Sequence, residues 1–302
     1  MGSFNMEKRK FGQTGMSLTA MGYGAMELRQ EKNHENAGKL LNTALDCGIN
    51  FVDTSPDYGM SEELIGRHVS NRRSEFYLAT KCGCNLSSEG AAHIFTREQF
   101  AKNLEESLRR LNTDYIDLWQ MHCVTPPELA GGKMDDSIAY MKEMQQKGYV
   151  RHIGISFKNG KATDAAYPTE HQKLYAKEMA DWGVFDSIQM VYGALTRVSE
   201  DAIEYISNRG MAVIARGVLQ RYFDYYREIP EKAKLFELFD DGDDLNAFLI
   251  RFALATPGIS TMIIGSGSSE HIAANAKTVA KGALSTDVFA EAKRRLDGVQ
   301  MM

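Results

Sequence analysis

Short β-rich runs alternate with helical patterns along nearly the whole of this 302-residue chain, and this alternation constrains the fold more than any other feature. The eight predicted strands lie at residues 18–23, 50–54, 75–81, 115–122, 150–156, 185–190, 211–215 and 261–265. Several of them are largely apolar, as expected for strands that are covered on both faces. The alternation predicts an α/β fold, a closed parallel (β/α)8 TIM barrel, in one domain that spans residues 1–302.

The helical segments carry the signals of helix ends. Residues 33–47 have one apolar stripe, and residues 96–111 begin with Thr96 followed by Gln99, a pattern typical of a capping box. Four glycines each follow a helical pattern and precede a strand, where a left-handed C-cap favours glycine: Gly48, Gly148, Gly183 and Gly210. These signals support the same division into strands and helices.

The segment ahead of the first helix adds a further element. Residues 10–18 have the pattern of a small hairpin with Gly12 and Gly15 in its turn, and we expect this N-terminal β-hairpin to cap the barrel bottom. The structural rival is an open doubly wound sheet. No GxGxxG motif follows the first strand, which argues against that rival.

Charge and composition narrow the classes of partner. Asp and Glu outnumber Lys and Arg by 40 to 35, whereas nucleic-acid binding needs concentrated positive charge. The sequence has no apolar run of about 18 residues and no N-terminal pattern of a signal peptide. Four cysteines (Cys47, Cys82, Cys84 and Cys123) show no disulfide-framework spacing. We therefore expect a cytoplasmic protein with a small-molecule substrate and with no nucleic-acid or membrane partner; the oligomeric state stays open.

Polar residues end three consecutive predicted strands. Asp53 ends the second, Lys81 the third and His122 the fourth, while Tyr58 lies in the loop that follows Asp53. Taken singly, each has an ordinary structural explanation as a cap, a solvent-reaching cation, a structural histidine or a packing tyrosine. Because the ends of adjacent parallel strands converge, the four together indicate one pocket at the C-terminal face of the barrel.

These residue types suit the reduction of a carbonyl group by hydride transfer. The reaction builds negative charge on oxygen, which must be stabilised and then protonated. A phenol donates poorly near neutral pH, and an ammonium beside it favours the phenolate, so Lys81 would activate Tyr58 as the proton donor. Asp53 would keep Lys81 oriented and charged. His122 would offer an N–H to the carbonyl oxygen.

Three motifs in this order resemble those of the aldo-keto reductase superfamily. Residues 53–66 (DTSPDYGMSEELIG) are similar to the family segment D-T-A-x-x-Y-G-x-S-E-x-x-L/I-G, with Ser55 in place of alanine. Residues 108–122 resemble its second signature, and residues 149–156 (YVRHIGIS) resemble G-K-V-R-x-I-G-V-S. The resemblance implies a barrel oxidoreductase in which Asp53, Tyr58, Lys81 and His122 form the catalytic tetrad, with Tyr58 as general acid.

The resemblance also implies a set of cofactor-binding residues. Ser156 and Gln189 match the positions that hydrogen-bond the nicotinamide carboxamide, and hydride leaves from the pro-R face in this family. The positions matched to the phosphate and adenine end are Gly265, Ser266, Gly267, Ser268, His271 and Asn275. Small residues at a helix N-terminus also form an anion site on physical grounds alone.

The expected cofactor is NADP(H), with NAD(H) as the alternative. His271 stands where several family members carry an arginine for the 2′-phosphate, but Lys281, Arg216 and the serine-rich loop could serve that group. Arg216 lies where the family commonly has Ser-Pro-Leu, and it could contact either the cofactor phosphates or a loop backbone. Phe157 replaces the usual asparagine after Ser156, as in a bacterial subset of the family.

The sequence predicts no metal site. Cys82, Cys84 and Cys123 lie near one barrel mouth, but C-x-C alone is weak ligand spacing, and Lys81 and His122 already have roles. A more modest hypothesis is that thiol modifiers inactivate the enzyme.

Two other functions compete with the reductase. One is an NADP(H)-binding regulatory or accessory subunit with little turnover, as some proteins of the superfamily are; the complete tetrad favours an enzyme. The other is a barrel glycosidase, which needs two acid–base carboxylates where Asp53 supplies one. Sugars, aliphatic aldehydes, quinones and cyclic ketones all stay open as carbonyl substrates.

Overall fold

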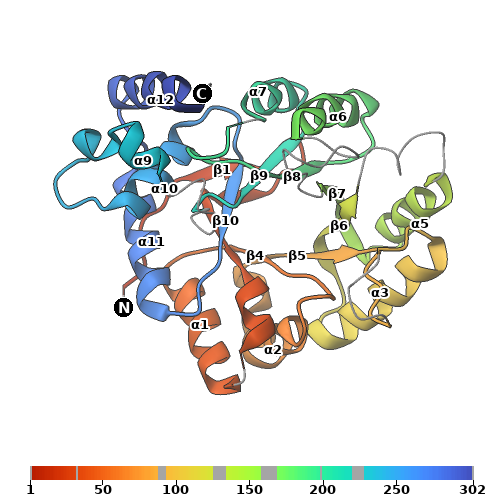
Figure 1. The fold of residues 1–302 in the computed structure, drawn as a ribbon. Coiled ribbons are helices and arrows are strands. Elements are labelled where there is room, and N and C mark those ends of the chain that lie inside the picture. The colour runs from red at the N-terminus through yellow and green to blue at the C-terminus, as the bar shows by residue number, and fades with distance from the viewer. Residues whose placement is uncertain are drawn as a thin grey trace.

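The structure is a computed structural model, and it describes residues 2–31, 33–87, 93–124, 134–157, 169–197, 199–219 and 228–300. Eight parallel strands close a barrel in the order β10-β3-β4-β5-β6-β7-β8-β9, which confirms the predicted fold (Figure 1). The strands are β3 (Met21–Gly24), β4 (Phe51–Asp53), β5 (Tyr77–Cys82), β6 (Ile116–Val124), β7 (Val150–Phe157), β8 (Ser187–Val191), β9 (Ala212–Arg216) and β10 (Thr261–Ile264).

Helices surround the barrel and cover its outer face (Figure 1). The α-helices are α1 (His34–Asp46), α2 (Ser61–Val69), α3 (Arg97–Leu111), α5 (Asp135–Gln146), α6 (Thr169–Trp182), α7 (Glu200–Asn208), α9 (Ile229–Lys232), α10 (Leu245–Ala255), α11 (Ser269–Lys281) and α12 (Thr286–Gln300). The 3-10 helices in the described ranges are η1 (Ala25–Gln30), η2 (Ser70–Glu75) and η4 (Leu235–Leu238). None of the helices in the described ranges is both long and apolar enough to span a bilayer.

The predicted N-terminal hairpin is present and closes the bottom of the barrel. Strands β1 (Lys8–Lys10) and β2 (Ser17–Thr19) pair antiparallel. Three hairpin side chains enter a buried cluster with inward-facing barrel residues; the cluster contains Phe11, Met16, Leu18, Phe51, Ala79, Leu118, Ala212 and Ile214. This apolar plug keeps water out of the lower half of the barrel.

The predicted strand at residues 18–23 is in fact two strands. Thr19 ends β2 in the hairpin, and β3 begins at Met21 in the barrel. Between them, the Ala20 amide donates to Glu7 in the hairpin, and the Ala20 carbonyl accepts from Met262 in the barrel. The chain changes partners at this residue, and the uninterrupted apolar pattern gives no sign of it.

The helix-end predictions hold with one correction. Asn33 caps α1, and the left-handed glycines after the helices are present, with φ values of 94° at Gly48 and 81° at Gly210. The Thr96 side chain accepts from the Gln99 amide, but the reciprocal half of the capping box is absent. The Gln99 side chain instead donates to the Cys84 carbonyl at 2.7 Å.

Candidate active site

Asp53, Lys81 and His122 converge at the C-terminal end of the barrel, as their positions at strand ends predict. They lie on the neighbouring strands β4, β5 and β6, and all three side chains are buried. In β4 and β5, Phe51 and Ala79 lie two residues earlier and face the apolar plug. Side chains alternate along a strand, so residues two apart share the inward face. The same periodicity that points Phe51 into the plug therefore points Asp53 into the mouth.

Lys81 and Asp53 form a buried ion pair. The Lys81 ammonium lies 2.7 Å from Asp53 Oδ1 and 2.8 Å from the Thr54 carbonyl. Burial disfavours the charged lysine, but the Asp53 carboxylate outweighs burial and holds the pKa of Lys81 above its ordinary value. The ammonium therefore stays charged throughout the neutral pH range.

Two glutamines complete the surroundings of Asp53. Gln120 Nε2 and Gln189 Nε2 donate to Asp53 Oδ2 at 2.9 and 3.0 Å. Gln120 is not among the site residues that the sequence predicts, although it lies two residues before His122 and therefore shares its inward face. With both carboxylate oxygens hydrogen-bonded, Asp53 is fixed in one orientation and in turn fixes Lys81.

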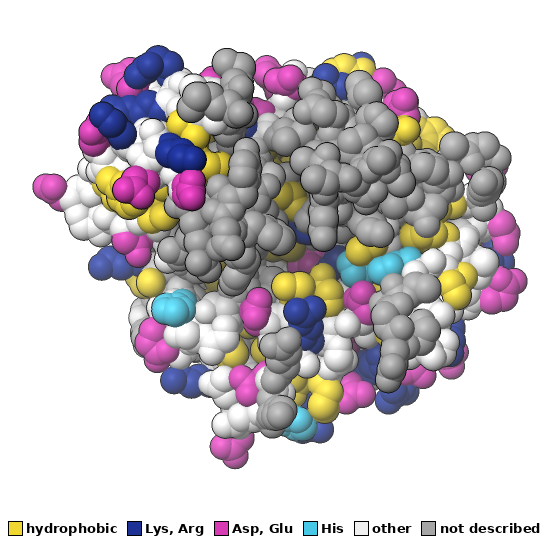
Figure 2. Space-filling view, viewed as in Figure 1, with side chains coloured by type: hydrophobic (Ala, Val, Ile, Leu, Met, Phe, Trp, Pro, Cys, Tyr) yellow, Lys and Arg dark blue, Asp and Glu magenta, His cyan; other side chains and the backbone are white. Residues whose placement is uncertain are grey.

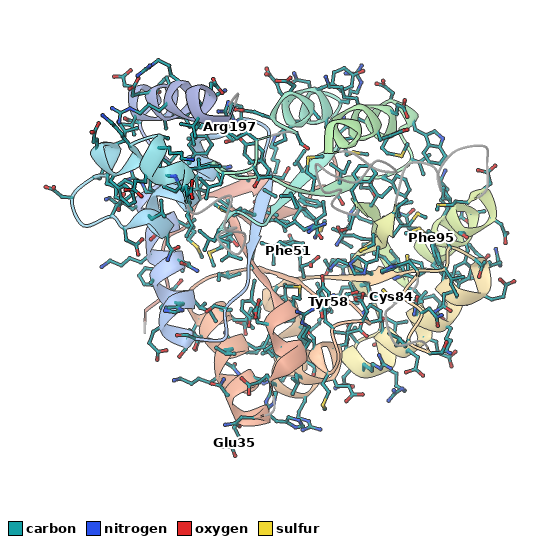
Figure 3. The ribbon with its side chains drawn as sticks, viewed as in Figure 1. Glu35, Phe51, Tyr58, Cys84, Phe95 and Arg197 are labelled. Atoms are coloured by element: carbon teal, nitrogen blue, oxygen red, sulfur yellow. The ribbon has the colours of Figure 1, made fainter. Side chains whose placement is uncertain are left out.

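Tyr58 lies over this ion pair. It follows β4 in a short loop whose turn is closed by a 3.0 Å bond from the Tyr58 amide to the Ser55 carbonyl. The Lys81 ammonium is 4.9 Å from the centroid of the Tyr58 ring, and the His122 ring is 6.0 Å away in an edge-on arrangement. Figure 3 shows Tyr58 and Cys84 close together on this side of the barrel, away from Arg197. The structure thus brings all four predicted tetrad residues together.

Ser156 and Gln189 meet on adjacent strands beside Asp53. They are register partners in β7 and β8, both are buried, and Ser156 Oγ donates to Gln189 Oε1 at 3.0 Å. A hydroxyl oxygen can also accept, and an amide group has a second N–H. This pair therefore has the donors and acceptors that a carboxamide needs.

A pocket of about 750 Å³ lies at the N-terminal end of α11. Five of the predicted cofactor residues line it: Gly265, Ser266, Gly267, His271 and Asn275. Ser268, the sixth, caps α11 by accepting from the His271 amide. A helix N-terminus with its positive dipole end favours an anion, so the pocket suits a phosphate-bearing ligand.

Two of the cations considered for that phosphate have other contacts. Lys281 lies 2.8 Å from Asp243, so it pairs with the α10 side of the fold. Arg216 donates to the carbonyl of Phe157, the last residue of β7, at 2.7 Å, so its partner here is strand backbone rather than the loop backbone that the sequence left open. Near the start of α11 stands Glu270, whose carboxylate accepts from Ser268 and Ser269 at 2.8 and 3.1 Å.

A cluster that the sequence analysis did not identify lies behind His122. His122 Nδ1 is 3.4 Å from the Cys84 thiol, 3.2 Å from His93 Nε2 and 3.3 Å from Asp57 Oδ2. Figure 2 shows histidine side chains on this face with acidic side chains beside them. Burial opposes protonation of His122, but its contacts with Asp57 and the cysteines outweigh burial and raise the pKa of its imidazole.

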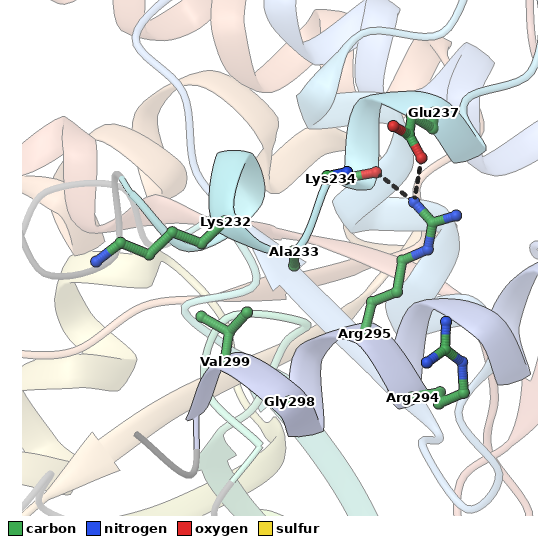
Figure 4. Close-up of a pocket in the computed structure, with 8 residues that line it drawn as sticks. All are labelled: Lys232, Ala233, Lys234, Glu237, Arg294, Arg295, Gly298 and Val299. Carbon is green, nitrogen blue, oxygen red and sulfur yellow. Dashed lines mark hydrogen bonds and ion pairs between the residues drawn. The ribbon is translucent and has the colours of Figure 1, made fainter.

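A second hollow, of about 410 Å³, lies between α12 and the segment around η4 (Figure 4). Arg295 donates to the Lys234 carbonyl and to Glu237, both at 2.8 Å, and Arg294 pairs with Glu291 at 2.7 Å. The arginines are already paired, and the hollow shares no lining residue with the pocket at α11. It takes no part in the site.

The fold and the site define a barrel oxidoreductase of the kind that works with a nicotinamide cofactor. The model of the Aldo/keto reductase family matches residues 20–296, and the chain belongs to this family. It is 28% identical to the uncharacterized oxidoreductase YqkF of Bacillus subtilis, over 89% of this chain and 90% of that protein. It is 29% identical to L-galactose dehydrogenase of Arabidopsis thaliana, over 91% of this chain and 88% of that protein.

Solved structures agree with this assignment. The holo form of the aldo-keto reductase AKR11C1 from Bacillus halodurans superposes with a TM-score of 0.81 at 26% identity, over 98% of this chain and 96% of that one. Among relatives found by sequence, a shorter match is the NADH-specific methylglyoxal reductase of Escherichia coli, at 28% identity over 66% of this chain and 62% of that protein.

Proposed function

We propose that this protein reduces an aldehyde or ketone to an alcohol with NADPH, and that Tyr58 is the general acid. The observation that carries the proposal is the stack of Tyr58 over a buried ammonium, with the ring centroid 4.9 Å from Lys81 Nζ. When bound, the cofactor supplies a hydride to the carbonyl carbon. Tyr58 gives its proton to the oxygen, so the carbonyl gains one hydride and one proton and becomes the alcohol.

The other tetrad residues support this proton transfer. Lys81 stabilises the phenolate that Tyr58 leaves behind, and Asp53 keeps Lys81 charged at 2.7 Å. His122 orients the substrate oxygen through an N–H and shares the developing negative charge. A single preorganised donor of this kind contributes on the order of 10²–10³ in rate.

The cofactor would lie between two sets of residues. Ser156 and Gln189 would bind the nicotinamide carboxamide, and the pocket of about 750 Å³ at α11 would hold the adenosine phosphate and adenine. His271 and the serine-rich loop support NADPH, whereas the engagement of Lys281 by Asp243 removes one cation from the 2′-phosphate. NADH is therefore the comparison that the assay must include.

The test is a panel of carbonyl compounds, including 4-nitrobenzaldehyde and 9,10-phenanthrenequinone, measured with NADPH and NADH side by side. We expect a fall in absorbance of the reduced cofactor with at least one compound, faster with NADPH, and its loss in Tyr58→Phe. A protein that binds NADPH tightly but turns over no member of the panel would instead be an accessory subunit.

The expected cytoplasmic location stays a prediction, to be read from the localisation of a tagged chain.

A further inference from the structure

Four side chains of metal-ligating type, one of them His122, converge on one point beside the proposed active site. Asp57 comes from the loop after β4, Cys84 and His93 are paired by an isolated β-bridge after β5, and His122 ends the inward-facing part of β6. One donor atom from each lies within 4.8 Å of every other. Four of the six separations lie between 3.2 and 3.7 Å.

We propose that Asp57, Cys84, His93 and His122 bind one zinc ion. A tetrahedral zinc with bonds of about 2.0–2.3 Å spaces its ligand atoms about 3.3–3.8 Å apart. The separations from His122 Nδ1 are at or just below this range, at 3.2 Å to His93, 3.3 Å to Asp57 and 3.4 Å to Cys84. The donor set is two imidazoles, a thiolate and a carboxylate, which suits zinc rather than magnesium or calcium.

Charge and burial favour a cation at this spot. The Cys84 side chain is fully buried, and the Asp57 and His93 side chains are each 15% exposed. A divalent ion balances one carboxylate and one thiolate, so the occupied site would be neutral inside the protein. The two imidazole nitrogens lie 3.2 Å apart, and an ion between them would accept a lone pair from each.

The donors are held in place by contacts outside the cluster. Ser55 Oγ donates to Asp57 Oδ1, which leaves Asp57 Oδ2 to face the two imidazoles. Gln99 and Asn103 of α3 both donate to the Cys84 carbonyl, at 2.7 and 3.0 Å. Such supporting hydrogen bonds orient ligands at protein zinc sites. The bond from Gln99 to the Cys84 carbonyl also takes up the side chain that would otherwise complete the capping box at Thr96.

The ion would act on the proposed reaction through His122, and this part of the inference rests on the proposed function. With Nδ1 bound to zinc, the proton of a neutral His122 ring must be on Nε2, the nitrogen available to donate to a substrate oxygen. The ion would also tie the Tyr58 loop, through Asp57, to β6. Four protein ligands close the coordination sphere, so zinc positions His122 and does not itself bind substrate.

This inference departs from the expectation of no metal drawn from the C-x-C spacing. That expectation considered Cys82, Cys84 and Cys123. The structure turns Cys82 away, toward the Gln120 carbonyl at 3.5 Å, and brings in His93 and Asp57, which no spacing rule connects to the cysteines.

The first experiment measures metal binding without substrate. The full-length protein is freed of metal, incubated with zinc, desalted and analysed for metal content; cobalt(II) then serves as a spectroscopic probe. We expect about one zinc per chain in wild type and in the control Cys82→Ala, and below about 0.2 in Cys84→Ser and His93→Asn. Cobalt should give a thiolate charge-transfer band that Cys84→Ser loses. Far-UV circular dichroism verifies that each variant is folded.

Wild-type protein that retains no zinc and shows no saturable cobalt spectrum would overturn the proposal. So would folded Cys84→Ser and His93→Asn variants that bind both ions as wild type does. If either variant fails to fold, the cobalt spectra of wild type and Cys82→Ala still test the site. Both proteins must show the cobalt–thiolate band, and its absence from either would overturn the proposal.

The second experiment separates the ion from the proposed reductase function. Zinc-free wild type should lose kcat by at least about 10-fold, with the KM for NADPH unchanged, and zinc should restore it. Equal kcat in zinc-free and zinc-loaded protein would overturn the positioning role while leaving the reductase intact. Zinc binding without any carbonyl turnover would overturn the proposed function and leave the metal site standing.

Discussion

The two ends of the barrel interior are built from the same strands and differ in almost every physical property. At the bottom, inward-facing side chains pack with the hairpin in a dry apolar cluster around Phe51 and Leu118. At the top, the next inward positions on those strands, Asp53 and Gln120, take part in a network of charges and hydrogen bonds around Lys81. A shift of two residues along a strand therefore separates a core from a site.

Stability and activity come from opposite ends of the barrel. Apolar burial at the bottom stabilises the barrel by roughly 25 cal/mol for each Å² removed from water. The buried ion pair at the top gains little net stability, because desolvation offsets much of its attraction. We infer that the plug keeps the barrel rigid, and that this rigidity holds the charged end in its reactive arrangement.

Lys81→Met, which removes the ammonium of the buried ion pair, should have the strongest effect on the protein. The variant leaves Asp53 buried without its cation, which costs about 3–5 kcal/mol of unfolding free energy. Turnover should also fall by at least about 10²-fold. Urea unfolding and steady-state kinetics measure the two effects. The double variant Asp53→Asn/Lys81→Met is the control and should recover part of the stability but none of the activity; recovered activity would contradict the role of Lys81.

At the apolar end, Phe51→Ala, a change two residues from Asp53, should lower stability by a similar amount but leave activity nearly intact. Removing this fully buried ring leaves a cavity and should cost about 3–5 kcal/mol of unfolding free energy. The kcat of the folded protein should stay within a few-fold of wild type. A loss of kcat as large as that of Lys81→Met, at a temperature where the variant is folded, would mean that the two ends are not separable.

The hairpin turn offers a smaller test with a matched control. A Cβ on Gly12 would lie 2.6 Å from the Gly210 carbonyl oxygen and 2.8 Å from the Ala212 amide, whereas a Cβ on Gly15 meets nothing within 4 Å. Both glycines have positive φ, so Gly15→Ala measures backbone strain alone, about 1–2 kcal/mol. Gly12→Ala should cost about 1–3 kcal/mol more. Thermal unfolding compares the two variants. Equal melting temperatures for Gly12→Ala and Gly15→Ala would show that the plug does not depend on the close approach of Gly12 to Gly210 and Ala212.

The smallest effect is expected at the rim of the polar end, from Glu270→Gln. This exposed carboxylate lies at the start of α11, where it would face the 2′-phosphate of NADPH. Its removal should improve the Kd for NADPH by a few-fold and leave that for NADH nearly unchanged, since only NADPH carries the extra charge. Fluorescence titration with both cofactors measures this, and an equal change in both Kd values would place Glu270 away from the phosphate.

Much of the fold was predictable because the barrel strands are short, several of them are largely apolar, and they alternate with helical patterns that carry end signals. The hairpin was predictable from its two turn glycines, although the apolar plug that it forms was not, and Asp53, Lys81 and His122 were predictable as polar residues at strand ends. The exchange of partners at Ala20 was not, because the apolar pattern runs through it. The expectation of one domain over residues 1–302 stays a prediction.

The surroundings of the site were harder to predict. Gln120 carried a usable signal, its two-residue spacing from His122. His93 and Asp57 carried none, since their meeting depends on the path of the chain after β5 and on a loop. Lys281 seemed available for the cofactor until the fold brought Asp243 to it. The sequence also contains long connections after two of the strands, at residues 123–133 and 157–167, and an aromatic run at 221–226, and most of these residues lie outside the described ranges.

A single-turnover experiment decides whether the phenol over the buried ammonium protonates the substrate as hydride arrives. NADPH-loaded wild type and Tyr58→Phe are mixed with a carbonyl compound that the panel identifies, and oxidation of the bound cofactor is followed by stopped flow. The account predicts a drop of at least about 10²-fold in the transfer rate, with the Kd for NADPH within a few-fold of wild type. An unchanged rate in Tyr58→Phe would contradict it.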